Sequence, residues 1–159
     1  MDETNVNGES AITITHIRFE HDHPASGIGV GRPRLSWSVE TTATAWRQTG
    51  YEIEAYSTDG TLRSQTGRVD SDQSVLAPWP FPPLASREKL MIRVRVWGPD
   101  ETPSAWSALA SVEAGLLSPD DWSARFITPS WEEDLTRAQP APLLRRDFDV
   151  HAGLTKARL

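Results

Sequence analysis

Two short segments of this 159-residue chain carry residue types that often bind metal ions. The segment HDH, residues 21–23, holds two imidazoles, and imidazole nitrogen is a common metal ligand. No third ligand is near and Pro24 follows, so a surface turn is expected there. The segment DSDQS begins like a calcium loop at Asp70, but Val75 replaces the required glycine and Phe81 stands where a bidentate glutamate is needed. Neither segment predicts a metal site.

Other elements of catalytic chemistry are also incomplete. The glycine-rich segment GIGVG, residues 27–31, lacks a following helix whose N-terminus would face a phosphate, because RLSWSVE after it alternates like a strand. Ser36 and Ser107 do not lie in the strand–turn–helix pattern that exposes a nucleophile. The chain has no cysteine, which excludes a thiolate nucleophile and a thiolate metal site. The sequence therefore predicts no cofactor, no metal and no catalytic residue in this chain.

Aromatic side chains are the remaining candidates for a ligand site, since the chain has seven tryptophans. Trp37 shares its strand face with apolar residues and is expected in the core. Trp79, which stands between prolines, is the best candidate for an exposed ring that contacts a sugar, followed by Trp131 and Trp97. Packing of Trp79 against a neighbouring domain is the alternative.

Arginine and tryptophan also share the outward face of one predicted strand. In LMIRVRVW, Arg93, Arg95 and Trp97 point to the same side, and the next strand brings Trp106 within the sequence SAWS. This pattern is similar to the tryptophan–arginine ladders of cytokine-receptor fibronectin domains. A guanidinium stacked on an indole contributes roughly 0.5–1 kcal/mol at an exposed site. We therefore expect these four residues to form a structural ladder.

Short alternating segments bounded by turn residues indicate an all-β fold. Seven strands are expected within residues 11–116, and this spacing is typical of a two-sheet antiparallel β-sandwich. In the first strand, ITITHIRF, the apolar parity changes, which predicts a kink or bulge near Thr15 and His16. The predicted core consists of Leu35, Trp37, Val39, Tyr51, Ile53, Leu84, Leu90, Ile92, Val94 and Val96.

The two ends of the chain differ from this central part. Residues 1–10 are polar and are expected to be a disordered tail. Residues 117–142 form an irregular, proline-rich connector, in which Trp122 is expected to anchor the exit from the sandwich. Residues 143–159 alternate again and are expected to begin a second β domain that these residues cannot complete. The expected partners are therefore downstream domains of the same polypeptide, with self-association through the last strands as an alternative.

The overall composition narrows the classes of partner. A net charge of −6 argues against binding to nucleic acid or to an anionic membrane. The first ten residues lack the basic and apolar parts of a signal peptide, and no apolar run is long enough to span a membrane. Together with the absence of cysteine, these features predict a soluble, cytoplasmic protein.

Two family resemblances are carried by specific residues. Seven motifs follow the order and spacing of the N-terminal region of bacterial α-L-rhamnosidases, over residues 14–159: GRPRLSW, RQTGYEIEA, DSDQSV, IRVRVWG, SAWS, AGLLSPDDWSARFI and APLLRRDF. The resemblance implies a fibronectin type III-like (immunoglobulin-like) antiparallel β-sandwich of about seven strands. In fibronectin type III domains a leucine six residues before a tyrosine builds a tyrosine corner. Leu84 matches that leucine, but Leu90 replaces the tyrosine, so packing alone must hold the turn.

The rhamnosidase resemblance also implies a function. The parent protein would be an inverting glycoside hydrolase that releases terminal L-rhamnose, and this chain would be a non-catalytic accessory domain without the catalytic barrel. Inversion needs two separated carboxyl groups, but Asp120, Asp121 and the acidic residues 132–134 lie in polar connector sequence and are expected to be solvated. Two alternatives stay open: a carbohydrate-binding module that uses exposed tryptophans, and a protein-interaction domain.

Overall fold

The computed structural model describes residues 12–21, 25–130, 134, 136–138 and 141–153. Contacts group Met1–Trp122 into one compact unit and Ser123–Leu159 into a second. Several predictions lie outside the described residues, namely those for residues 1–10, Asp22, His23, Trp131 and residues 154–159.

One sheet of the sandwich has two antiparallel strands, β1 (Ile12–Phe19) and β3 (Leu35–Thr41). The register between them shifts around His16, whose φ is 51°. Ile14 is buried before the shift and Ile17 is buried after it, although a regular strand would place them on opposite faces. The shift is the bulge that the change of apolar parity predicts, so that prediction is confirmed.

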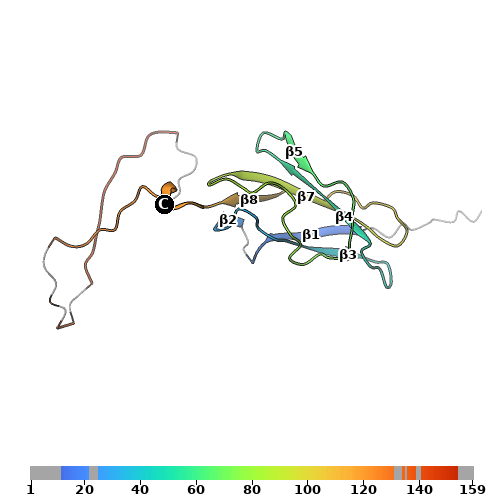
Figure 1. The fold of residues 1–159 in the computed structure, drawn as a ribbon, viewed down its shortest axis with the longest axis horizontal. Helices are drawn as coiled ribbons and strands as arrows, with labels where there is room; N and C mark the ends of the chain where they lie inside the picture. Colours follow the sequence, from blue (N-terminus) through green and yellow to red (C-terminus); the bar gives the residue numbers. More distant parts are fainter. Residues whose placement is uncertain (1–11, 22–24, 131–133, 135, 139–140, 154–159) are drawn as a thin grey trace, which may run out of the picture. The chain divides into compact units, whose positions relative to one another are not determined.

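The larger sheet runs in the order β2 (Ala25–Ile28), β8 (Ala110–Ala114), β7 (Lys89–Trp97), β4 (Gly50–Tyr56) and β5 (Leu62–Gln65). The short strand β6 (Val69–Asp70) also pairs with β4, and β2 pairs in parallel with β8. Figure 1 shows β1 and β3 as a separate layer beside this sheet. The fold is therefore an all-β, immunoglobulin-like sandwich, as the family resemblance implies.

The apolar core lies between the two layers. Alternate residues of β4 and β7 share one face, which places their branched side chains inward. Val39 is only partly buried, because β3 lies in a sheet for which the described residues supply just two strands. The other predicted core residues are all buried, namely Leu35, Trp37, Tyr51, Ile53, Leu84, Leu90, Ile92, Val94 and Val96.

A buried polar network crosses one part of the core. Trp37 Nε1 donates to Gln48 Oε1 at 3.0 Å, and Gln48 Nε2 donates to the carbonyl oxygens of Ser71 and Gln73 at 3.0 and 3.1 Å. Gln48 is only 6% exposed, so water cannot readily replace its side-chain amide. Without that amide, the Trp37 N–H and the two carbonyl oxygens would lose this hydrogen-bond partner. Trp37 also meets Tyr51 edge-on, with ring centroids 5.1 Å apart, and burial raises the pKa of Tyr51.

Four segments differ from the predicted elements. Residues 25–28, where the sequence predicts no strand, form β2 because they pair with β8. The strand predicted from Trp106 begins only at Ala110. Residues 73–77, QSVLA, whose apolar and strand-forming residues predict one of the seven short strands, make only one isolated bridge, between Leu35 and Ala77. Residues 143–150, expected to begin a second β domain that this chain cannot complete, pair with no strand in the described part of the chain, and the expectation of that second domain stays a prediction.

Candidate functional site

Charged side chains cover the outer face of β4 and β7. Antiparallel pairing sets Glu52 and Glu54 of β4 opposite Arg95 and Arg93 of β7. Glu54 Oε2 lies 2.6 Å from Arg93 Nε, and Glu52 Oε2 lies 2.6 Å from Arg95 Nη2. The two glutamates are 7% and 8% exposed, so their carboxylates need these partners to offset the loss of hydration.

Aromatic rings alternate with the same guanidinium groups. Arg93 Cζ lies 4.5 Å and Arg95 Cζ 4.6 Å from the centroid of Trp106, which places the indole between two arginines. Further contacts of 5.0–5.3 Å extend the stack at both ends. The tryptophan–arginine ladder therefore has the order Tyr56, Arg93, Trp106, Arg95, Trp97 and Arg68.

Two serines hold Trp106 in place, although its segment is not a regular strand. The hydroxyls of Ser104 and Ser107 each accept from a backbone N–H of β7, Val96 and Val94 respectively, at 3.0 Å. The N–H groups of both serines donate to the carbonyls of the same β7 residues at 2.8 Å. The serine hydroxyls thus replace the missing backbone acceptors of a strand partner. This role of the serines in SAWS was not predicted from the sequence.

One end of the ladder is closed by ion pairs. Arg68 Nε lies 2.8 Å from Asp70 Oδ1, and the Arg68 guanidinium also contacts the carboxylate of Glu101. The hydrogen bond from Arg68 lowers the pKa of Glu101. At the other end, the Tyr56 hydroxyl donates to Glu54, and this hydrogen bond raises the pKa of Tyr56. Every arginine of the ladder is paired with a carboxylate and stacked on a ring, an arrangement that stabilises the sheet face.

A hydrogen-bonded turn lies where the chain leaves the sandwich. The exit turn, residues 117–122, contains the one-turn helix η1 (Pro119–Asp121). A capping box closes the start of this helix: the Ser118 side chain accepts from a backbone N–H of the helix, and the Asp121 side chain accepts from the Ser118 N–H. The Asp121 carboxylate accepts from the Ser118 N–H at 2.9 Å and from the hydroxyl of Ser86, whose oxygen in turn accepts from the Leu117 N–H at 2.9 Å. The Ser86 hydrogen bond lowers the pKa of Asp121.

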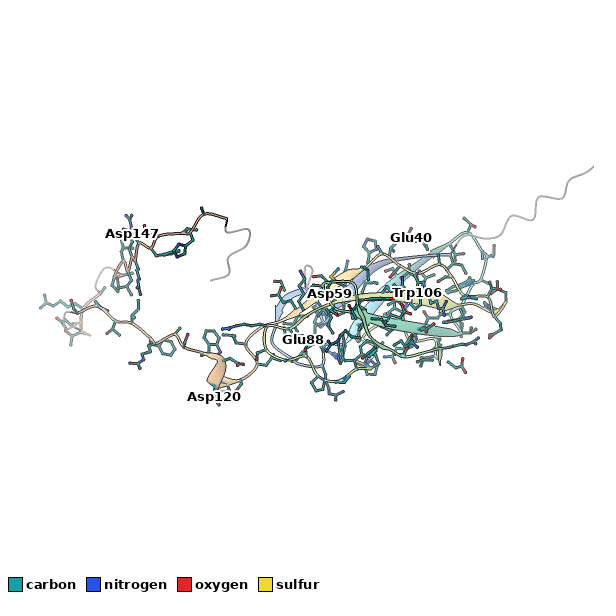
Figure 2. The ribbon with its side chains drawn as sticks, turned by 90° about the horizontal axis from the view of Figure 1, so that it is seen from above. Glu40, Asp59, Glu88, Trp106, Asp120 and Asp147 are labelled. Carbon is teal, nitrogen blue, oxygen red and sulfur yellow. The ribbon has the colours of Figure 1, made fainter. Side chains whose placement is uncertain are left out.

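The exit turn joins the loop before β7 to the end of β8. Figure 2 labels Asp120 on the one-turn helix of this exit turn. Trp122, at the end of the turn, is 63% exposed. The compact unit therefore extends to Trp122, beyond the boundary predicted at residue 116, because the Ser86–Asp121 contact holds the turn against the sandwich.

The tryptophans predicted to contact sugar are placed differently. Trp79 is 4% exposed, so the prediction of an exposed ring is wrong. Its loop folds inward because Nε1 donates to the Pro82 carbonyl at 2.9 Å and the ring meets Phe19 and Phe81 edge-on. Trp97 is 7% exposed, since arginines of the ladder cover it. Neither ring offers a free surface for stacking.

Other acidic and histidine side chains of the described residues do not gather into a site. Within the part of the chain that the structure describes, no group of three or more His, Asp or Glu side chains could hold a metal ion. Asp120 and Asp121 lie in the exit turn, where Asp121 accepts structural hydrogen bonds. Among the same residues, no helix has the length and apolar character needed to cross a membrane.

Comparison with known proteins identifies what this sandwich resembles. The sequence pattern of the family described as "Rha78A-like, N-terminal immunoglobulin domain" matches residues 14–118. An α-L-rhamnosidase of Streptomyces avermitilis is 36% identical over 123 residues, which cover 75% of this chain but 12% of that protein. An α-L-rhamnosidase of Formosa agariphila is 30% identical over 144 residues, or 84% of this chain and 16% of the relative.

A solved structure agrees with these sequence matches. The crystal structure of a native α-L-rhamnosidase from Aspergillus terreus is 41% identical, with a TM-score of 0.65, over 71% of this chain and 13% of that chain. This chain thus spans less than a fifth of the length of the relatives that it matches. The ladder lies within the matched residues 14–118, and the exit turn, residues 117–122, lies at the end of the match.

Proposed function

We propose that this chain, which belongs to the family of Rha78A-like N-terminal immunoglobulin domains, is the non-catalytic scaffold domain of an α-L-rhamnosidase. The observation that carries the proposal is the extent of the match. The pattern covers residues 14–118 of this chain, whereas the chain covers only 12% of the Streptomyces avermitilis rhamnosidase. The structure is consistent with a scaffold, because the charged side chains on the outer face of β4 and β7 form internal ion pairs.

The scaffold role is tested by exchanging domains in the Streptomyces avermitilis relative. One variant lacks the region that this chain matches, and a second carries residues 12–122 of this chain in its place. We expect the deletion to lower Tm and the exchange to restore it, with kcat/KM for an aryl α-L-rhamnoside within about twofold of the parent. An unchanged Tm in the deletion variant would contradict a scaffold role, and a restored Tm with a raised KM would instead indicate a part in substrate binding.

The segment after the exit turn supports a partner within the same polypeptide. Leu143, Phe148 and Val150 are 96%, 68% and 59% exposed, and Leu144 shares the parity of the last two. An extended segment with one apolar face is typical of a half-buried strand, yet no strand pairs with it in the described residues. Its proposed partners are downstream domains of a longer polypeptide.

Hydrogen exchange distinguishes this partner from self-association. The backbone amides of residues 143–150 are compared in this chain and in the full-length protein. We expect rapid exchange in this chain at low concentration and strong protection in the full-length protein. Equal exchange in both would contradict the proposal, and protection that appears in this chain as its concentration rises would indicate pairing between copies.

A further inference from the structure

A hollow of about 730 Å³ lies between two loops of the sandwich, and its lining includes Ser104 and Ala105, which directly precede Trp106 of the tryptophan–arginine ladder. One wall is the loop between β3 and β4 at residues 43–46, and the other is the loop between β7 and β8 at residues 99–105. Ile12 and Thr13 of β1 complete the lining. A volume of this size falls within the range of small-molecule sites, roughly 300–1,000 Å³.

The side chains that line the hollow suit a neutral, hydroxylated ligand. The lining residues include three threonines, an aspartate and a tryptophan, namely Thr13, Thr44, Thr102, Asp100 and Trp46. Asp100 Oδ1 also accepts from the Thr102 N–H at 3.3 Å. The lining contains no lysine, arginine or histidine, so it offers no cation for an anionic ligand. Hydroxyls and a carboxylate can pair with the hydroxyl groups of a sugar, while an indole can pack against the C–H face of a pyranose ring.

Trp46 has an unsatisfied polar atom at this wall. Its Nε1 is fully buried and has no hydrogen-bond partner, although the ring as a whole is partly exposed. Nε1 is pressed against Gly98, where an added Cβ would lie only 2.2 Å from it. A buried N–H without an acceptor is destabilising and calls for a specific explanation. Because Nε1 faces Gly98 and not the hollow, a ligand oxygen in the hollow accepts from this N–H only after the indole ring turns.

The walls of the hollow are held in place by the rest of the sandwich. The Thr49 hydroxyl donates to the Gly98 carbonyl at 3.0 Å, and Ser104 binds the edge of β7. Ala45 and Glu101, one on each wall, have φ values of 54° and 59°, a region that residues other than glycine seldom occupy. Strained backbone of this kind is retained where the surrounding structure fixes it, and it clusters at ligand sites.

We propose that this hollow binds a single neutral pyranose unit, with Trp46 as the stacking surface and Asp100 and Thr102 as hydrogen-bonding partners. The site lies in the same compact unit as the ladder but shares none of its residues. The proposal is independent of the scaffold role, because a domain can bind sugar whether or not it stabilises a neighbouring domain.

The test is a titration of the isotopically labelled chain with methyl α-L-rhamnopyranoside, methyl α-D-glucopyranoside and methyl α-D-mannopyranoside, followed by the ¹H–¹⁵N signals of the tryptophan indoles. The Trp46 signal is assigned as the one missing from Trp46→Phe. For a ligand of this size we expect a dissociation constant on the order of 1–10 mM for at least one glycoside. The Trp46 indole signal should shift on binding, and inorganic phosphate should cause no shift.

Two matched variants separate this site from other binding. Asp100 and Asp72 are both exposed aspartates, but only Asp100 lines the hollow. Asp100→Ala should weaken binding by at least about tenfold, whereas Asp72→Ala should leave it unchanged. The proposal is overturned if no glycoside shifts the Trp46 signal up to about 100 mM, far above the expected dissociation constant. It is also overturned if the shifts persist unchanged in Asp100→Ala.

Discussion

Replacing Trp106 by leucine removes the ring that lies between Arg93 and Arg95. The two guanidinium contacts, at 4.5 and 4.6 Å, contribute about 0.5–1 kcal/mol each, or about 1–2 kcal/mol together. The apolar surface that leucine fails to cover adds about 1 kcal/mol. We therefore expect Trp106→Leu to lower the free energy of unfolding by about 2–3 kcal/mol, while the ion pairs to Glu52 and Glu54 remain.

The assay is urea unfolding of the full chain, followed by circular dichroism. Trp122→Leu is the matched control, because the Trp122 side chain is 63% exposed; we expect it to change the free energy of unfolding by less than about 0.5 kcal/mol. A double-mutant cycle with Arg95→Met should give a coupling of about 0.5–1 kcal/mol between Arg95 and Trp106. If Trp106→Leu and Trp122→Leu are equally stable, the ladder does not stabilise the fold and the reasoning is refuted.

Three further changes test other parts of the structure. Gly98→Ala places a Cβ 2.2 Å from Trp46 Nε1, so urea unfolding should show a loss of about 1–3 kcal/mol; wild-type stability would mean that the indole moves freely. Gln48→Leu strands the Trp37 N–H and two carbonyls, and the same assay should show a loss of about 2–4 kcal/mol; a neutral result would mean that water replaces the amide. Asp121→Asn should speed chymotryptic cleavage after Trp122 at neutral pH, because the amide lacks the charge that holds the exit turn; cleavage at the wild-type rate would contradict the role of the carboxylate. Because the folded pKa of Asp121 is lowered, the stability that its carboxylate adds should be lost only as pH falls through that pKa.

Much of the fold could be predicted from the sequence because strand periodicity is local. Alternation in β4 and β7 places Ile53 and Val94 inward, and the parity change in β1 predicts the bulge. The parallel pairing of β2 with β8 could not be predicted, since Ala25–Ile28 lacks an alternating pattern and becomes a strand only through a distant partner. Proline-rich sequence likewise suggested exposure for Trp79, whereas tertiary packing buries it.

Four of the ladder residues could be predicted from the sequence for the same reason, but Tyr56 and Arg68, which extend the ladder at its two ends, were not predicted. Arg93 and Arg95 share a strand face, so their proximity follows from the two-residue period of a strand. Their pairing with Glu54 and Glu52 depends on the register between β4 and β7, which no local pattern specifies. The hollow near Trp46 is formed by two loops that are far apart in the sequence. The one sequence feature that points to it is Trp46 itself, which follows the small residues TTATA.

The most direct test of the central proposal is hydrolysis of p-nitrophenyl α-L-rhamnopyranoside by the purified chain, with the Streptomyces avermitilis relative as positive control. A non-catalytic scaffold domain should release no nitrophenol above the buffer rate at any chain concentration. Release that rises in proportion to the concentration of this chain, and that disappears when the chain is unfolded by urea, would contradict the account.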